Sequence, residues 1–173
     1  AGGGGRGMRI VERVDTLLES VQAAQRDAEM WFGDDTVYME RFLQKPRHVE
    51  VQVLGDGNGH AIHLYDRDCS LQRRHQKVLE EAPAPNLPEQ ARADILEACV
   101  NACKLMQYRG AGTFEFLFED GEFFFIEMNT RVQVEHPVTE MVLGIDLVKA
   151  QILTAQGREL FWPSEFMARG HAI

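Results

Sequence analysis

The chain has 173 residues, of which 45% are hydrophobic and 26% charged, which suits a soluble globular protein with a sizeable core. Its formal net charge of −9 at pH 7 would repel a polyanion and argues against nucleic-acid binding. No apolar run approaches the ~20 residues that span a bilayer, and the 3 cysteines form no paired framework, so we expect a cytoplasmic protein.

The first part of the chain is predicted to contain a glycine loop, a short strand and a helix. The loop covers residues 1–7, and the strand covers Met8 to Val11. Between Val14 and Phe32 the apolar residues recur close to helical spacing, and Gly33 is expected to end the helix. The chain opens in the middle of this low-complexity loop and lacks an initiating Met, so we expect a fragment of a longer protein.

The middle of the chain is predicted to form an antiparallel meander. β-forming residues are concentrated in the segments 37–43, 48–54 and 61–65. Asp56-Gly57-Asn58-Gly59 separates the last two segments and is typical of a hairpin turn. Later in the chain, Glu89 to Gln107 and about Ile145 to Ala155 are predicted helices. The mixture indicates an α+β fold whose sheet is more antiparallel than parallel.

A second hairpin is predicted near Asp120. A simple turn at Asp120-Gly121 would mix apolar and charged side chains on both faces of its strands. A three-residue loop, 119–121, instead places Glu115 on the same side as Glu127. The opposite face would then carry five apolar residues, namely Phe114, Phe116, Phe124, Ile126 and Met128.

The returning strand of this hairpin carries polar residues at period two, namely Glu127, Asn129, Arg131, Gln133 and Glu135. An ordinary solvated face is the commoner explanation of such a pattern. However, Glu127 lies in a Phe-rich stretch, which indicates a central strand with limited water. Carboxylate and amide oxygens suit Mg²⁺ or Mn²⁺, and we therefore favour a metal site at Glu115, Glu127 and Asn129.

Three other features each leave a functional and an ordinary explanation open. Arg131 and Glu135 are either a surface ion pair or an anion site in which Arg131 holds an oxyanion and Glu135 accepts a proton. The glycine loop is either a flexible linker or a lid over phosphates. The run of basic residues around Lys77 is either a solvated patch or a receptor for phosphate or bicarbonate.

Taken together, five strings in the chain resemble the biotin carboxylase family of ATP-grasp enzymes, which includes the biotin carboxylase component of acetyl-CoA carboxylase. The strings are GGGGRGM from Gly2, PRHVEVQV from Pro46, RDCSLQRRHQKVLEEAPAP from Arg67, YRGAGTFEF from Tyr108 and FIEMNTRVQVEHPVTEM from Phe125. They occur in the family's order and cover nearly the whole chain, so the resemblance is specific.

The resemblance implies a role for each matched residue. The lid loop would place Gly4 and Gly5 at the phosphates of ATP, and the remaining nucleotide contacts would be Glu40, Arg41, Leu43, His48, Gln72 and His75. Metal would be bound by Glu115, Glu127 and Asn129. Bicarbonate would be bound by Lys77, Arg131, Gln133, Val134 and Glu135, with Arg131, Glu135 and Lys77 catalytic and Glu135 the base that deprotonates bicarbonate.

The resemblance also implies a reaction and partners. ATP would phosphorylate bicarbonate to carboxyphosphate, which delivers CO₂ to biotin on a carrier protein, with a carboxyltransferase acting next. The parent enzyme would be a homodimer with Mg²⁺ or Mn²⁺ as cofactor. Residues 1–42 would be the remainder of the lid, and 43–173 part of the catalytic domain.

Departures from the family pattern indicate that the isolated chain is inactive. The family's N-terminal domain, its lysines before the glycine loop and an arginine beyond His171 are not present. Two alternatives are another ATP-grasp ligase, such as carbamoyl-phosphate synthetase, and a non-catalytic nucleotide-binding module. The RRHQK and EMNTRVQVEHPVTEM strings argue against the first, and the retained Glu115, Glu127 and Arg131 argue against the second.

Overall fold

The chain divides into two units, residues 1–44 and 45–173, in the computed structural model, which describes residues 7–74, 76–158 and 167–173. Each unit is considered by itself. Among the described residues, no helix combines the length and the apolar character that crossing a bilayer requires.

The first unit contains the predicted helix but neither of its predicted strands. A 3₁₀ turn, η1 (Val14–Thr16), leads into α1 (Leu17–Phe32). Gly33 ends α1 as predicted: it adopts a left-handed φ of 69°, and its N–H donates to the Glu29 carbonyl at 2.9 Å. The strands predicted at residues 8–11 and 37–43 are wrong. Among the described residues of this unit no neighbouring strand exists, so their backbone groups have no ladder to join.

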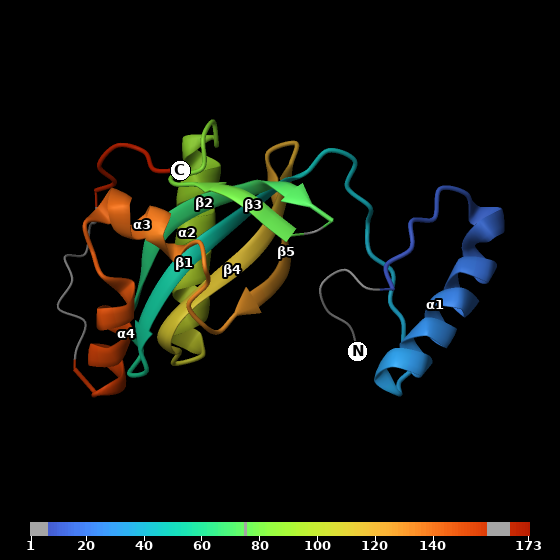
Figure 1. The fold of residues 1–173 in the computed structure, drawn as a ribbon, viewed down its shortest axis with the longest axis horizontal. Coiled ribbons are helices and arrows are strands. Elements are labelled where there is room, and N and C mark those ends of the chain that lie inside the picture. The colour runs from blue at the N-terminus through green and yellow to red at the C-terminus, as the bar shows by residue number, and fades with distance from the viewer. Residues whose placement is uncertain (1–6, 75, 159–166) are drawn as a thin grey trace. The chain divides into compact units, whose positions relative to one another are not determined.

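The second unit is built on a five-stranded sheet with the order β3-β2-β1-β4-β5, in which every pairing is antiparallel (Figure 1). Its strands are β1 (Arg47–Asp56), β2 (Ala61–Arg73), β3 (Gln76–Glu81), β4 (Arg109–Glu119) and β5 (Glu122–Asn129). The predicted hairpin joins β1 to β2, and there the Asp56 carboxylate accepts the Asn58 N–H at 2.7 Å. The antiparallel pairing of the predicted segments 48–54 and 61–65 is therefore confirmed, whereas the third segment of the predicted meander is not a strand, β2 is longer than predicted and β3 was not predicted.

Helices cover the two faces of the sheet. α2 (Glu89–Leu105) packs through Leu96, Cys99 and Cys103 against the face that carries Val51 and Phe114. α4 (Leu147–Ala155) packs against the opposite face, which carries Leu54, Leu64 and Ala111. Both helices confirm the predicted segments, with ends that differ by about two residues. A further short helix, α3 (His136–Leu143), was not predicted.

The cysteines behave as the sequence suggested. Cys69, Cys99 and Cys103 are all free and buried. Burial raises the pKa of Cys99 to about 12 and that of Cys103 to about 11, so these thiols stay protonated at neutral pH.

The hairpin between β4 and β5 corrects the predicted register. Its turn has only two residues, Asp120 and Gly121, with φ of 52° and 87°, and Glu119 pairs with Glu122. The extra residue lies in the strand instead: Phe116 pairs with Phe125, but Glu115 pairs with Glu127, which leaves Ile126 as a bulge.

The bulge changes which aromatic rings share a face. Phe123 and Phe125, not Phe124 and Ile126, lie on the side of Phe116, with ring centroids 5.8 Å from it in both cases. Glu115 and Glu127 nevertheless share a face as predicted, because a bulge before Glu127 reverses the facing of the residues beyond it as a longer turn would have done. They pair directly across the ladder, however, whereas the longer turn would have placed them diagonally.

Two expectations about β5 are wrong. β5 is an edge strand rather than a central one, and Glu127 is exposed. The period-two line also stops at Asn129, where the strand ends. The chain has to turn within six residues to enter α3, which begins at His136, so residues 131–135 do not extend the sheet face.

Candidate functional site

A row of charged residues crosses the sheet on the face opposite α2. Glu50 on β1 pairs with Arg67 on β2 and with Glu115 on β4, and Glu115 pairs with Glu127 on β5. Neighbouring carboxylates directly across a ladder repel one another. The row therefore requires cations close by.

Lys77 on β3 supplies one of these cations. Its Nζ donates to Glu50 Oε2 at 2.5 Å, to Glu115 Oε1 at 2.8 Å and to Glu135 Oε1 at 2.7 Å. Although burial lowers it, the charge of Glu50 and the hydrogen bonds to Glu115 and Glu135 raise the pKa of Lys77 above its usual range. Lys77 is thus a fixed ammonium that joins β1, β4 and the start of α3.

Glu115 is the most heavily hydrogen-bonded carboxylate of the site. Besides Lys77, its Oε1 accepts from Asn129 Nδ2 at 2.9 Å and from Gln133 Nε2 at 2.8 Å. Its Oε2 lies 2.9 Å from His48 Nε2. Burial opposes ionisation, but the hydrogen bonds from His48 and Lys77 outweigh it and lower the pKa of Glu115 to about 2.

Gln72 determines the tautomer of His48. Its Nε2 lies 2.7 Å from His48 Nδ1, and an amide nitrogen can only donate, so Nδ1 accepts and the proton resides on Nε2, facing Glu115. The structure therefore brings together seven of the predicted site residues, which are His48, Gln72, Lys77, Glu115, Asn129, Gln133 and Glu135.

The lowered pKa of Glu115 predicts an acid-sensitive contribution to stability. The folded pKa of about 2 lies below the usual 4.5, so this stabilisation is present above pH 4.5 and is lost as pH falls toward 2. Glu115→Gln should lower the free energy of unfolding by about 2 kcal/mol at pH 7, after allowance for solvent screening, and by much less at pH 2.5. Urea unfolding of the chain at several pH values measures this difference. The lowered pKa of Glu115 would be contradicted if the difference in unfolding free energy between Glu115→Gln and the unmutated protein did not shrink as pH falls. An equal loss of unfolding free energy in the exposed control Glu122→Gln would contradict it as well.

Other predicted residues lie outside this cluster. Val134 is 92% exposed, and the side chain of Glu127 forms no hydrogen bond with another described residue. Arg131 is exposed, but its Nη2 donates to Asn129 Oδ1 at 3.2 Å and so reaches the edge of the cluster. The predicted adenine-pocket residues are in the first unit, in the segment after α1 without regular structure, namely Glu40, Arg41 and Leu43. Gly4, Gly5 and His75 lie outside the described residues.

The predicted metal ligands fit Mg²⁺ or Mn²⁺ by the type of their oxygen atoms. Glu115 and Glu127 face each other across β4 and β5, and the amide of Asn129 contacts Glu115. Hard oxygen ligands of this kind are those that these ions prefer. Exposure of Glu127 leaves room for phosphate and water to complete an octahedron.

Two other groups of potential ligands lie deeper, His48 with Glu50 and Glu115, and Cys69 with Glu50 and Glu135, with ligand atoms within 4.8 Å of one another. The ammonium of Lys77 contacts all three of these carboxylates. Burial also raises the pKa of the Cys69 thiol, which opposes thiolate ligation. Protein cations therefore neutralise these inner groups, whereas no cation among the described residues contacts Glu127.

The sequence reasoning missed Arg67 and Glu50. The side chains of both are fully buried, and Arg67 Nε donates to Glu50 Oε1 at 2.6 Å. A signal was available in the HVEVQV string, where Glu50 and Gln52 alternate with Val49, Val51 and Val53. Polar residues at period two between valines indicate a second polar face inside a buried strand.

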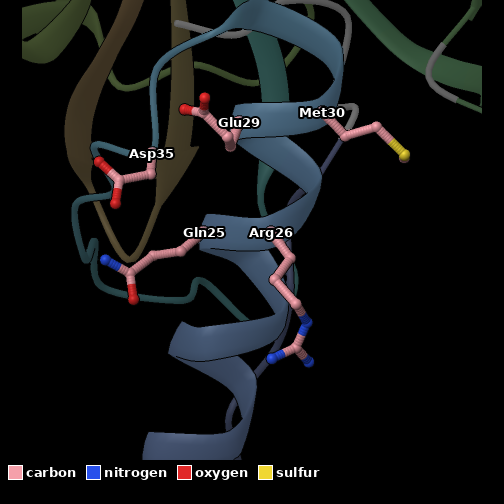
Figure 2. A pocket seen from close by; sticks show the side chains of 5 residues that line it. All are labelled: Gln25, Arg26, Glu29, Met30 and Asp35. Carbon is pink, nitrogen blue, oxygen red and sulfur yellow. The ribbon is translucent and has the colours of Figure 1, made fainter.

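Two surface hollows lie away from this cluster. One is in the first unit, where Figure 2 shows Gln25, Arg26, Glu29 and Met30 on α1 and Asp35 on the segment that follows. The other lies between β2 and α2, on the other face of the sheet, and includes His63 and Leu96. Neither hollow contains a predicted site residue.

Known proteins are similar to nearly the whole of this chain. Residues 1–162 match the family model described as carbamoyl-phosphate synthase L chain, ATP binding domain. The chain belongs to this family. The match confirms the resemblance to ATP-grasp enzymes and the α+β fold class.

Several of the similar proteins are named as biotin carboxylases. One from Allochromatium vinosum is 60% identical over 99% of this chain and 38% of its own length. A crystal structure of a biotin carboxylase–beta-gamma-ATP complex from Campylobacter jejuni has a TM-score of 0.91 and 51% identity, covering 98% of this chain and 38% of that one.

A third comparison names ligands as well. The biotin carboxylase domain dimer of Hydrogenobacter thermophilus 2-oxoglutarate carboxylase, in complex with MgADP, ADP and bicarbonate, has a TM-score of 0.90 and 45% identity over 98% of this chain and 38% of that one. This chain therefore spans less than half the length of the relatives that it matches.

Proposed function

We propose that this chain is the nucleotide-, metal- and bicarbonate-binding segment of a biotin carboxylase, an ATP-dependent ligase that carboxylates biotin on a carrier protein. The observation that carries the proposal is the position of Lys77, whose ammonium joins Glu115 to Glu135. One cation thereby links the residue proposed for ATP and metal to the residue proposed for bicarbonate.

The nucleotide end of the proposed site is centred on Glu115. His48 and Gln72 lie beside it in a fixed tautomeric arrangement, and Asn129 and Glu127 complete an oxygen-rich edge. We assign Mg²⁺ or Mn²⁺ to Glu115, Glu127 and Asn129, where the ion would neutralise phosphate charge. The remaining nucleotide contacts are proposed by family resemblance, namely Gly4, Gly5, Glu40, Arg41, Leu43 and His75.

The bicarbonate end is centred on Lys77 and Glu135. Lys77 and Arg131 supply positive charge for a small oxyanion, Gln133 supplies an amide donor, and Val134 lies between Gln133 and Glu135 in the chain. Glu135 is proposed to remove the proton from bicarbonate, whose oxygen then attacks the γ-phosphorus of ATP. Carboxyphosphate forms with release of ADP and breaks down to CO₂ and inorganic phosphate. The ureido nitrogen of biotin gives up its proton to the phosphate and takes up the CO₂. Lys77 stabilises negative charge during the phosphoryl transfer.

The rest of the enzyme is proposed from the relatives. Residues 1–42 would be the remainder of the ATP-grasp lid and residues 43–173 part of the catalytic domain. The parent enzyme would be a cytoplasmic homodimer that serves a biotin carboxyl carrier protein and a carboxyltransferase, as in acetyl-CoA carboxylase and fatty acid biosynthesis. Because the chain spans 38% of its relatives, we expect no turnover from the isolated segment.

Steady-state assays of the full-length protein that contains this chain test the proposal. We expect ADP and carboxybiotin to form from ATP, bicarbonate and free biotin, with a requirement for Mg²⁺ or Mn²⁺. The family description favours one competing outcome, synthesis of carbamoyl phosphate from bicarbonate and a nitrogen donor. Carbamoyl phosphate as the product, or ATP binding without any turnover, would contradict the proposal.

A further inference from the structure

Arg67 is the largest of the fully buried side chains among the described residues. It lies on β2, one strand away from Lys77, and its guanidinium reaches β1, β4, the segment after β5 and α3. A buried cation of this kind is costly unless every donor finds an acceptor. The arrangement of its acceptors indicates a function in addition to folding.

The first connection runs through Glu50 to Lys77. Arg67 Nε donates to Glu50 Oε1 at 2.6 Å, and Lys77 Nζ donates to Glu50 Oε2 at 2.5 Å. Burial opposes ionisation of Glu50, but the charges of Arg67 and Lys77 lower its pKa. Glu50 is therefore a carboxylate bridge that transmits the position of Arg67 to the ammonium at the site.

The second connection orients Gln133. Arg67 Nη2 lies 3.4 Å from Gln133 Oε1. Because a guanidinium has only donors, the amide oxygen of Gln133 must face Arg67, and its Nε2 is left to face Glu115, at 2.8 Å. The amide of Gln52 is oriented in the same way: its Oε1 accepts from Arg67 at 2.8 Å, and its Nε2 donates to the Gly112 carbonyl at 2.8 Å.

The third connection holds α3. Arg67 Nη1 donates to Thr139 Oγ1 at 2.9 Å. Thr139 is buried one turn into α3, and Glu135 is the residue that immediately precedes this helix. Arg67 thereby ties to the sheet the helix that carries Glu135 at its start.

We propose that Arg67 is a positioning residue for the bicarbonate half of the site, which acts through Glu50, Gln133 and Thr139 on Lys77, the Gln133 amide and Glu135. The inference rests on the proposed function. It differs from a purely structural role because the three connections converge on the bicarbonate residues and not on the predicted adenine-pocket residues.

Steady-state kinetics of Arg67→Lys in the full-length protein test this role. Lysine keeps the charge but lacks the fork, so it cannot reach Glu50, Gln133 and Thr139 together. We expect the KM for bicarbonate to rise by about tenfold or more, while the KM for ATP stays within about twofold. Thr139→Val keeps the side-chain shape and removes one connection, so it should show the same selectivity with a smaller rise, even if Arg67→Lys folds poorly.

Arg92→Lys is the matched control. Arg92 also contacts a buried carboxylate, since its Nε donates to Asp66 Oδ1 at 3.0 Å, but it lies on α2, away from the charged cluster. It should lower the thermal midpoint without changing the KM for bicarbonate. The role of Arg67 would be overturned if the KM for bicarbonate and the KM for ATP rose equally, or if neither KM changed in Arg67→Lys and in Thr139→Val. Either result would leave the proposed function itself intact. An unmutated protein that fails to carboxylate biotin would overturn the proposed function, and this inference with it.

Discussion

Glu135→Gln is expected to lower the turnover of biotin carboxylation by about a hundredfold or more, which is the usual contribution of a positioned base. Glutamine retains the shape of the side chain and an oxygen that can accept from Lys77, which now lies 2.7 Å from Glu135 Oε1. The substitution therefore removes the proton acceptor while retaining the local packing. The measurement is steady-state carboxylation of free biotin by the full-length protein, with bicarbonate varied at saturating ATP, together with a separate nucleotide-binding assay.

Two comparison variants sharpen this test. Glu97→Gln makes the same change at an exposed position on α2 and should leave turnover unchanged. Arg131→Ala removes a guanidinium fork at the edge of the cluster, and by the usual range for charged hydrogen bonds its loss should weaken bicarbonate use by about ten- to a hundredfold. Near-normal turnover in Glu135→Gln would refute the base assignment. Loss of nucleotide binding in the same variant would mean that Glu135 supports the fold instead.

Glu127→Gln is expected to abolish most of the metal-dependent part of ATP affinity, with a loss of about a hundredfold in the presence of Mg²⁺. The carboxylate is exposed, lies directly opposite Glu115 and forms no hydrogen bond with another described residue. Its replacement by a neutral amide therefore removes a ligand without breaking an internal contact. Calorimetry on the full-length protein, with and without Mg²⁺, measures the difference.

The control for this variant lies on the same strand. Glu122→Gln makes the same change at the exposed start of β5, beside the hairpin turn, and should leave ATP affinity unchanged. An unaltered Mg²⁺ dependence in Glu127→Gln would overturn the metal assignment. If Glu127→Gln lowered ATP affinity by the same factor without Mg²⁺ as with it, Glu127 would contact the nucleotide itself.

Local patterns in the sequence predicted those elements whose signals are themselves local. The helix that Gly33 ends, the hairpin at Asp56 and the helix from Glu89 were all predicted and are present. The matched strings also indicated the ATP-grasp family, because several long strings in the family's order identify a family without any knowledge of the fold. Lys77 was named as an anion contact from such a string, without any knowledge of its neighbours.

Errors arose where the pairing of distant strands decides the outcome. Hydrophobic alternation correctly indicated that Glu115 and Glu127 share a face of the sheet, but it could not distinguish a longer turn from a bulge at Ile126, since both reverse the face on which the later residues lie. It also extended the strand beyond Asn129, because residues 131–135 retain the alternation although the chain turns toward α3.

The sequence by itself determined the fold class, the family and the residue types that we propose for ATP, metal and bicarbonate. Tertiary structure alone decided that Lys77 contacts Glu50, Glu115 and Glu135, which lie 27, 38 and 58 residues away in the chain. It likewise decided that Arg67 is fully buried and connects the sheet to α3. The physical reason is that a charge can be buried only where opposite charges and hydrogen-bond acceptors from several distant segments converge, and that convergence exists only once the sheet has assembled.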